Sequence, residues 1–248
     1  WLDDVRIRGT PLDVDENPPN CTIDYLENKN SHNTFPFNSM IWINEDGQFY
    51  IYGTANDTES NIYNVQYNRT SPNTYLLWTD ADPTDGAFNE LSEDWRSDPN
   101  DASFIEGLHK VCCRATDDAD NAAVGECQSF CIDLTAPSMD SISDNTQDCS
   151  DDGKYWNKTK ITWTWTAHDD PDCGEIDYYV VKLMKKGNSN PVEVANVSGT
   201  SWTNTNPLED GKTYFVYVIP VDKAKNVGNA IKSDEVIIDL TDPTISVI

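Results

Sequence analysis

Clustered carboxylates are the residues of this chain whose type and spacing best define a chemistry. Asp117, Asp118 and Asp120 fall within one short segment that ends at Asn121. Hard oxygen ligands at alternate positions suit calcium, so Asp118 and Asp120 are candidate metal ligands. Aspartate and asparagine also form turns by hydrogen-bonding their own backbone, which explains the same residues without a metal.

A second copy of this segment favours the turn-forming explanation. It runs from Asp222 to Asn226 and has Lys223 and Lys225 where the first copy has acids. The residues that both copies share therefore shape a turn. The sequence predicts no cofactor, and calcium at the first turn is kept as the alternative.

No catalytic constellation is evident in the sequence. His32, His109 and His168 are far apart, and His109 lies on the inward face of a predicted strand, where a hydrogen-bonded core histidine is expected. The chain has no Gly-rich phosphate loop, no Gly-x-Ser-x-Gly and no His-Glu-x-x-His. We therefore predict no catalytic residues and no enzymatic activity.

Disulfide formation is the clearest covalent chemistry. The chain has seven cysteines, and an odd total leaves at least one thiol free or bonded to another chain. Cys112 and Cys113 are adjacent and face opposite sides of a strand, whereas Cys127 and Cys131 share a face of the next. We expect Cys112 to bond with Cys127 or Cys131, and the inward Cys113 to bond with Cys21.

A further disulfide is expected between Cys149 and Cys173. They flank a strand of about eight residues, a span of roughly 26 Å. Because a disulfide needs Cα atoms within about 7 Å, the loop that holds Cys149 must fold back.

Acceptor sites for asparagine-linked glycans point to the compartment. These sites are Asn20, Asn56, Asn68, Asn157 and Asn196. Such sites have meaning only outside the cytosol, and with the cysteines they favour an extracellular or cell-surface location. We expect glycans above all at Asn68, Asn157 and Asn196, near predicted strand ends or in loops.

Charge excludes some partners. Lysine and arginine number 17 against 43 aspartates and glutamates, giving a formal net charge of −26. This field repels nucleic acid and anionic lipid. No apolar run approaches the ~20 residues of a membrane span, so direct membrane insertion is not expected. The start at Trp1 without a signal-peptide pattern is typical of a mature or excised form.

The elements that must position these residues are repeated. Ile-Asp-Leu-Thr-Ala-Pro at 132–137 recurs as Ile-Asp-Leu-Thr-Asp-Pro at 238–243, and Ala-Asn-Asp at 55–57 is answered by Ala-His-Asp at 167–169. With the two turns, these anchors recur in the same order about one hundred residues apart. This order indicates two copies of one module.

Short alternating runs bounded by Gly, Pro, Asn and Asp predict an all-β fold. In the clearest run, Ile161, Trp163, Trp165 and Ala167 share one face, which in a two-sheet sandwich is the core. Residues 71–103 are expected to form a loop-rich crossing between sheets.

Tryptophans in less regular segments could form a sugar-binding platform. These are Trp78, Trp95 and Trp202. Core or inter-module packing is the preferred explanation, because large aromatic residues dominate cores and interfaces.

Motifs in each half resemble known families. Trp165, residues 176–180, Leu208 to Tyr214 and residues 221–226 resemble a fibronectin type III domain. That resemblance implies a core tryptophan and a Leu-x-x-Gly-x-x-Tyr corner leading into the sixth strand.

The first half carries a different set of marks, followed by the Ile-Asp-Leu-Thr-Ala-Pro close. They are residues 53–57, 85–88 and 106–109. This half resembles the immunoglobulin-like repeats of bacterial and archaeal cell-surface proteins. The matches cover most of residues 18–243, and they imply an all-β fold of two tandem immunoglobulin-like (fibronectin type III-like) β-sandwiches, with little information on function.

The resulting organisation has four parts. Residues 1–17 are an N-terminal strand or the end of a preceding module, and 244–248 start a following module or form a donor strand. Residues 18–137 form the immunoglobulin-like sandwich and 138–243 the fibronectin type III-like sandwich.

These features predict a non-enzymatic structural component of an extracellular surface layer, stalk or filament. Its expected partners are other copies of itself or neighbouring modules of a longer chain, joined through terminal strands around residues 4–8 and 245–247. The alternative is an adhesin or a carbohydrate-binding accessory module of a secreted protein, which exposed tryptophans lining one groove would favour.

Overall fold

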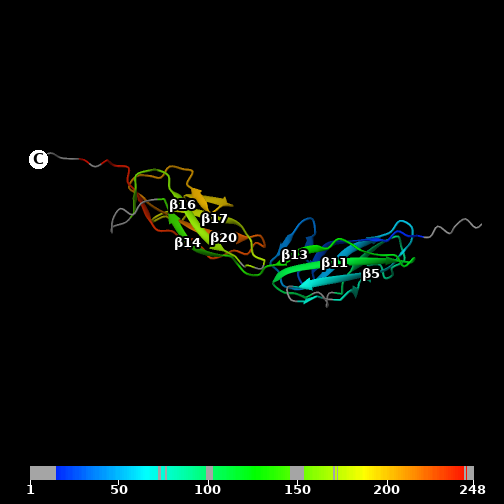
Figure 1. The fold of residues 1–248 in the computed structure, drawn as a ribbon. Helices are drawn as coiled ribbons and strands as arrows, with labels where there is room; N and C mark the ends of the chain where they lie inside the picture. The colour runs from blue at the N-terminus through cyan, green and yellow to red at the C-terminus, as the bar shows by residue number, and fades with distance from the viewer. Residues whose placement is uncertain are drawn as a thin grey trace, which may run out of the picture. The chain divides into compact units, whose positions relative to one another are not determined.

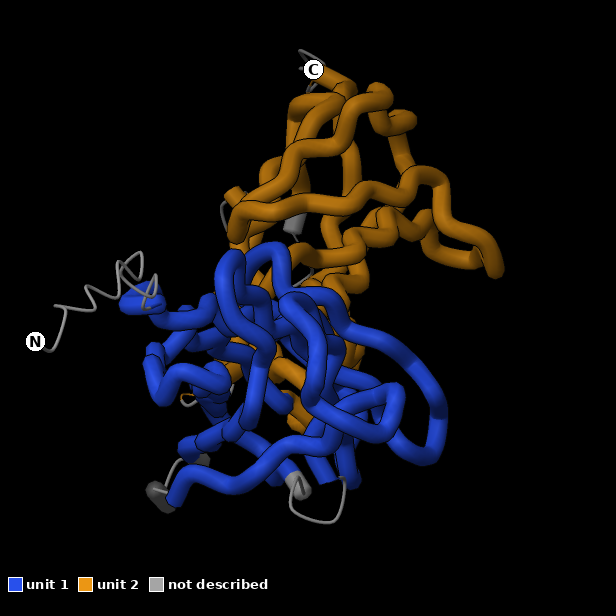
Figure 2. Tube along the Cα trace, turned by 90° about the vertical axis from the view of Figure 1, so that its right-hand side faces the viewer, with its two compact units in different colours: residues 1–132 blue, residues 133–248 orange. Residues whose placement is uncertain are grey.

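The computed structural model describes residues 15–71, 74–75, 77–98, 103–145, 154–169, 171, 173–242 and 244 (Figure 1). The chain divides into two compact units, residues 1–132 and 133–248 (Figure 2). All regular elements of the described residues are β-strands, so the all-β prediction is confirmed. The terminal segments around residues 4–8 and 245–247 lie outside the described residues.

The first unit is a sandwich of two sheets. One sheet has the strand order β2-β1-β4-β9-β8, and the other β3-β13-β11-β5-β6. The short strands β10, β7 and β12 pair with β4, β5 and β11. The bounds are β1 (Asn20–Asn28), β2 (Thr34–Pro36), β3 (Ile41–Ile43), β4 (Gly47–Asn56), β5 (Ile62–Ser71), β6 (Thr74–Tyr75), β7 (Thr79–Asp80), β8 (Asp82–Pro83), β9 (Ser92–Arg96), β10 (Ser103–Phe104), β11 (Gly107–Asp117), β12 (Ala122–Val124) and β13 (Gln128–Ile132).

The second unit repeats this arrangement with fewer strands. Its sheets have the orders β14-β16-β19 and β15-β22-β20-β17-β18, and β21 pairs with β20. The bounds are β14 (Ser138–Asp144), β15 (Lys154–Trp156), β16 (Thr162–His168), β17 (Ile176–Lys185), β18 (Glu193–Val197), β19 (Ser201–Thr203), β20 (Thr213–Asp222), β21 (Ile231–Lys232) and β22 (Val236–Ile238).

Both units follow one topological plan. In each, a short strand at the edge of a sheet pairs in parallel with the last strand of the unit, β3 with β13 and β15 with β22. All other strand pairs among the described residues are antiparallel. The order β13-β11-β5 of the first unit matches the order β22-β20-β17 of the second, as in immunoglobulin-like and fibronectin type III-like sandwiches. The predicted tandem sandwiches are confirmed.

Alternation along the strands builds each core. In β4, Phe49, Ile51 and Ala55 are buried, while the tyrosines between them point outward. In β16, Trp163 is fully buried and Trp165 is 4% exposed. The period of two in the sequence therefore identifies the inner face of both strands.

The crossing segment contains more structure than the sequence predicts. It includes β9, which joins the first sheet and buries Trp95 completely against Tyr67, with ring centroids 6.5 Å apart. Gly53 on β4 makes the space: an added Cβ would lie 2.5 Å from the Trp95 ring. Trp95 is thus a core residue because its neighbour has no side chain.

The division between the units falls before Asp133, a few residues ahead of the boundary expected at Pro137. The backbone carbonyl of Asp133 accepts a hydrogen bond from Nδ2 of Asn226 at 2.9 Å. Asp133 is therefore tied to the turn that follows β20, within the second unit.

Replacing Trp165 should destabilise the second unit. Trp165→Ala removes a buried ring that packs against Tyr179 at 5.3 Å, so we expect a loss of about 3–5 kcal/mol in the free energy of unfolding. Chemical denaturation of the full chain measures this. Thr164→Ala, on the exposed face of the same strand, is the matched control and should change stability by less than about 0.5 kcal/mol.

Candidate functional site

The acidic turn places its residues on two sides of the chain. Asp118 and Asp120, the predicted calcium candidates, are exposed, whereas Asp117 is fully buried. Asp117 Oδ1 accepts hydrogen bonds from the backbone N–H groups of Ala119 and Asn121 at 2.9 and 2.8 Å. The buried residue of the turn thus makes the turn-forming hydrogen bonds.

The same turn recurs in the second unit. The backbone N–H of Asn226 donates to Asp222 Oδ1 at 2.8 Å, and Asp222 is fully buried. Asp120 and Lys225 occupy equivalent positions with φ of 67° and 74°, a left-handed conformation that aspartate tolerates better than lysine. Backbone geometry is therefore conserved between the copies even where charge is not.

Each buried aspartate belongs to a trio of carboxylates whose oxygens lie within 4.8 Å of one another. The trios are Asp15, Asp57 and Asp117 in the first unit, and Asp133, Asp169 and Asp222 in the second. These trios are not evident from sequence spacing, because their members lie far apart in the chain, but one sequence signal points to their buried members. Buried residues alternate along β11 up to its last residue, so Asp117 continues the inward face.

Disulfides join the elements of the first unit. Cys21 on β1 bonds to Cys113 on β11, linking the two sheets through the core, with Cα atoms 6.0 Å apart. Cys112, on the other face of β11, bonds to Cys127. Sequence separations of 92 and 15 residues correspond to about 4.5 and about 3 kcal/mol of chain-entropy stabilisation.

The remaining cysteines are Cys131, Cys149 and Cys173. Cys131 and Cys173 are disulfide-bonded. Cys149, the predicted partner of Cys173, lies outside the described residues.

Most of the glycan acceptor sites are accessible. Asn20, Asn56, Asn157 and Asn196 are exposed. Asn68 lies in the last part of β5, which continues to Ser71; it is half-buried and pairs with Cys112. Glycosylation at these sites stays a prediction.

His109 is a core residue. It is fully buried, and its Nε2–H donates to the carbonyl of Ile105, four residues upstream, at 2.6 Å. In the second unit the buried Tyr214 holds the matching place near the start of β20, where its hydroxyl accepts from the N–H of Glu209 at 3.2 Å. Tyr214 forms the corner that the fibronectin type III resemblance implies, and His109 serves the same purpose.

Another histidine completes a hydrogen-bonded chain across β14 and β16. His168 Nε2 is hydrogen-bonded to the Ser138 hydroxyl at 2.8 Å, and its Nδ1 to Asp140 Oδ1 at 2.8 Å. The sequence did not suggest this set because antiparallel pairing of Ser138 with His168 creates it. The order resembles nucleophile, base and orienting acid, but the His168 side chain is 67% exposed, whereas such chemistry relies on a water-excluded site.

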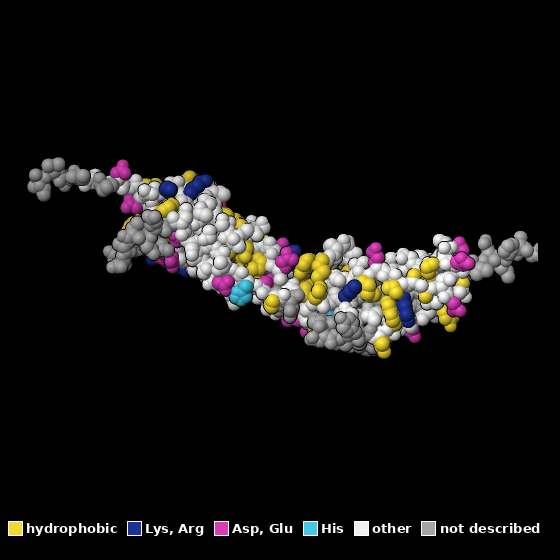
Figure 3. Space-filling model, viewed as in Figure 1, with side chains coloured by type: hydrophobic (Ala, Val, Ile, Leu, Met, Phe, Trp, Pro, Cys, Tyr) yellow, Lys and Arg dark blue, Asp and Glu magenta, His cyan; other side chains and the backbone are white. Residues whose placement is uncertain are grey.

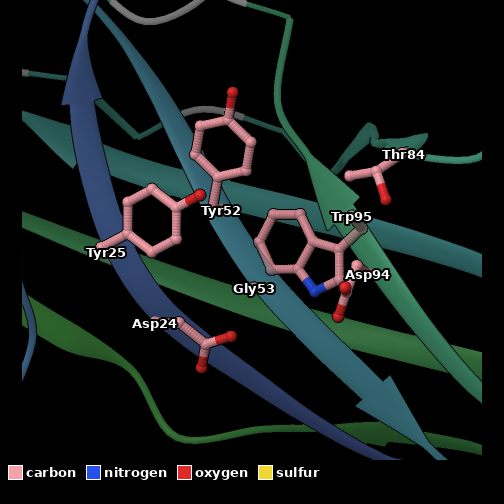
Figure 4. Close-up of a pocket in the computed structure, with 7 residues that line it drawn as sticks. All are labelled: Asp24, Tyr25, Tyr52, Gly53, Thr84, Asp94 and Trp95. Atoms are coloured by element: carbon pink, nitrogen blue, oxygen red, sulfur yellow. The ribbon is translucent and has the colours of Figure 1, made fainter. Parts of the chain in front are cut away.

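A pocket of about 380 Å³ lies on the outer face of the first sheet. Figure 4 shows Tyr25 and Tyr52 side by side on neighbouring strands. Their rings stack with centroids 4.6 Å apart, and burial raises the pKa of both hydroxyls. The carboxylates of Asp24 and Asp94 also line the pocket. The Thr54 hydroxyl lies between them, 2.8 Å from Asp24 Oδ2 and 3.3 Å from Asp94 Oδ1, and donates to these oxygens.

The tryptophans do not line one groove. Trp95 is in the core of the first unit, and Trp202 stacks on Trp163 in the second, with centroids 5.8 Å apart. Trp78 is half-buried beneath the guanidinium of Arg114, 4.7 Å from the ring centroid. The feature that would favour a tryptophan-based sugar platform is therefore not found among the described residues.

Charge is dispersed over the visible surface. On the face drawn in Figure 3, acidic side chains are spread over both units and do not gather in a single patch. A helix able to span a membrane is not found in the described part of the chain.

Comparison with known proteins gives structural similarity alone. No family model and no curated protein sequence matches the chain. Similar solved structures include titin domains A168–A170, with TM-score 0.49 and 10% identity over 88% of this chain and 66% of that one. The chain therefore spans about two thirds of the titin fragment.

The match to two further structures extends over nearly the whole length of those structures. They are the fibronectin(III)-like modules of Clostridium thermocellum CbhA, with TM-score 0.36 and 11% identity over 88% of this chain and 94% of that one, and the human OSCAR ligand-binding domain, with TM-score 0.36 and 9% identity over 89% and 98%. At these TM-scores the fold assignment rests on the strand order itself.

Protonation of His109 should destabilise the first unit. Burial holds the pKa of His109 below its usual value, so the neutral form is favoured in the folded state. The contribution of neutral His109 to the free energy of unfolding is fully present above about pH 6.5, the pKa of a histidine in the unfolded chain. It is lost as the pH falls below this value, by up to about 1.4 kcal/mol at pH 5.5.

Urea unfolding of the chain between pH 7.5 and 5.5 measures this loss. His109→Gln keeps a side-chain N–H donor and has no titrating group, so its stability should fall less over the same interval. An equal fall in both proteins would assign the pH dependence to other groups.

Proposed function

We propose that this chain is a non-enzymatic structural component of an extracellular surface layer, stalk or filament. The observation that carries the proposal is the repetition of one sandwich plan in both units, with the first unit crossed by a buried disulfide. Repeated, stapled sandwiches suit mechanical reach and assembly in an oxidising environment. Exposed acceptor asparagines on both units support the same location.

Assembly through terminal strands is the proposed mode of association. An extended segment that adds to an open sheet edge satisfies backbone groups that would otherwise attract non-specific partners. One candidate receiving edge is β18, which lies at the edge of its sheet. Val194 in this strand and Val192 just before it are 54% and 47% exposed. The donating segments are residues 4–8 and 245–247.

Electron microscopy of the purified native material tests this function. Fibres or lattices are expected, and deletion of residues 1–9 should shorten them while circular dichroism shows both sandwiches still folded. Glycopeptide mass spectrometry should find glycans at Asn157 and Asn196, which are exposed. Dispersed particles, with unmodified peptides at all acceptor sites, would contradict the proposal.

The pocket beside Tyr25 and Tyr52 favours a second candidate, carbohydrate binding by an adhesin or accessory module. Aromatic faces combined with carboxylate acceptors suit sugar rings and hydroxyls, and the volume of about 380 Å³ accommodates a small ligand. Affinity electrophoresis in soluble polysaccharides should then show retardation of the chain. Tyr52→Ala should abolish it, while Tyr63→Ala, which changes an exposed tyrosine outside this pocket, should not.

A further inference from the structure

The carboxylate trio of the second unit has the spacing of a cation site. Asp133, Asp169 and Asp222 each offer an oxygen within 4.8 Å of the others, and Asp133 and Asp222 are fully buried. Two ligands about 2.4 Å from one calcium ion can lie at most about 4.8 Å apart. The three oxygens of the trio meet this distance condition for contact with a single ion.

A second observation, separate from the spacing of the trio, also indicates a bound cation at Asp222. Its Oδ1 accepts the backbone N–H of Asn226, but its Oδ2 is buried and accepts no hydrogen bond. An unsatisfied buried acceptor is costly, and more so when it carries charge. A bound cation would satisfy this oxygen and reduce repulsion within the trio.

The lysines of this turn do not argue against a cation. They replace Asp118 and Asp120, which are exposed and lie outside the first trio. Lys223 Nζ lies 2.6 Å from Glu175 Oε1, and Lys225 Nζ donates to Asp177 Oδ2 at 2.6 Å. The trio members of the two turns are Asp117 and Asp222, and at this position both turns have aspartate.

The three positions recur in both units. Asp57 and Asp169 directly follow β4 and β16, and Asp117 and Asp222 end β11 and β20. The side-chain amides of the turn asparagines donate to the carbonyls of the first members: Asn121 to Asp15 at 3.0 Å and Asn226 to Asp133 at 2.9 Å.

The trios differ in how their oxygens are satisfied. In the first unit Asp117 Oδ2 accepts Nδ2 of Asn121 at 3.0 Å, and Asp15 Oδ2 accepts the Ser60 hydroxyl at 2.6 Å. The Ser60 hydroxyl and the backbone N–H of Asn17 lower the pKa of Asp15. The donors to Asp117 and Asp15 occupy lone pairs that a metal would need. The second trio is therefore the better cation site.

We propose that Asp133, Asp169 and Asp222 bind a calcium ion. The ion joins the segment before β14, the end of β16 and the end of β20, so binding stabilises the second unit by mass action. Its expected dissociation constant is about 10⁻⁴–10⁻³ M, the range of extracellular calcium modules. The inference goes beyond the structural role and does not depend on it, since binding is measured on the purified chain.

Calorimetry and urea unfolding of the full chain, freed of metal by chelation, test the site. About 5 mM calcium should lower the unfolding equilibrium constant of the calcium-sensitive transition about 6- to 50-fold. Asp222→Asn keeps the oxygen that accepts the Asn226 N–H but removes a charge. It should weaken binding about tenfold or more, yet unfold at an equal or higher urea concentration in chelator, because like-charge repulsion is relieved.

Matched variants separate this site from diffuse binding to a chain of net charge −26. Asp239→Asn is the control: Asp239 is exposed and accepts the N–H of Thr241 at 3.1 Å, as Asp133 accepts that of Thr135 at 3.1 Å. It should bind calcium like the unmodified chain. Asp169→Asn, a second trio variant, should repeat the loss if Asp222→Asn does not fold.

Three outcomes would overturn the proposal. One is an unmodified chain that binds no calcium at about 10 mM, well above the expected constant. Another is unchanged affinity in the foldable trio variant, which would assign binding to the surface. The last is loss of binding in Asp117→Asn alone, which would place the ion in the first unit.

Discussion

A carboxylate buried at the end of β11 in the first unit, and of β20 in the second, is the interaction on which each unit depends. Strand alternation carries the inward face of β11 and β20 to its final residue, and in both cases that residue is an aspartate. A buried carboxylate must be hydrogen-bonded, paired or metal-bound. Asp117 and Asp222 satisfy part of this requirement by shaping the next turn, which lies between β11 and β12 in the first unit and between β20 and β21 in the second.

The same carboxylate connects the turn to the start of the unit. The turn asparagine reaches the backbone of the segment that leads into the first strand, through Asp15 in one unit and Asp133 in the other. A single local motif therefore organises a strand end, a turn and the entry of the chain. Two of the repeated segments, the turns at 117–121 and 222–226 and the Ala-x-Asp segments at 55–57 and 167–169, supply members of both trios.

The sequence predicted those parts of the fold that depend on period and local chemistry. The alternation around Trp163 and Trp165 identified a buried face, and the Leu-x-x-Gly-x-x-Tyr stretch identified the corner at Tyr214. It did not predict β9, because Trp95 enters the core through the space at Gly53, a neighbour on another strand. Such packing depends on pairing across the sheet, which one sequence does not display.

The acidic site, like the packing of Trp95, could not be predicted from the sequence alone. Counting aspartates in a turn drew attention to Asp118 and Asp120, whose carboxylates are exposed. The trios instead combine residues from three separated segments, and only the fold brings them within 4.8 Å. Local composition thus located the turn, while burial along the strand decides which of its carboxylates faces the other two.

Different interactions stabilise the two units, each of which has a small hydrophobic core. The first encloses the Cys21–Cys113 bond, which restricts the unfolded chain over 92 residues and is independent of the ions in the medium. The second unit also contains a disulfide-bonded cysteine, Cys173. Its core packs aromatic residues such as Trp163, fully buried against Trp202, and it holds a trio in which Asp222 Oδ2 accepts no hydrogen bond. A covalent cross-link stabilises at any calcium concentration, whereas a cation site stabilises only when the ion is present. With the proposed calcium site, the stability of the second unit depends on the calcium concentration, whereas the disulfide of the first unit does not.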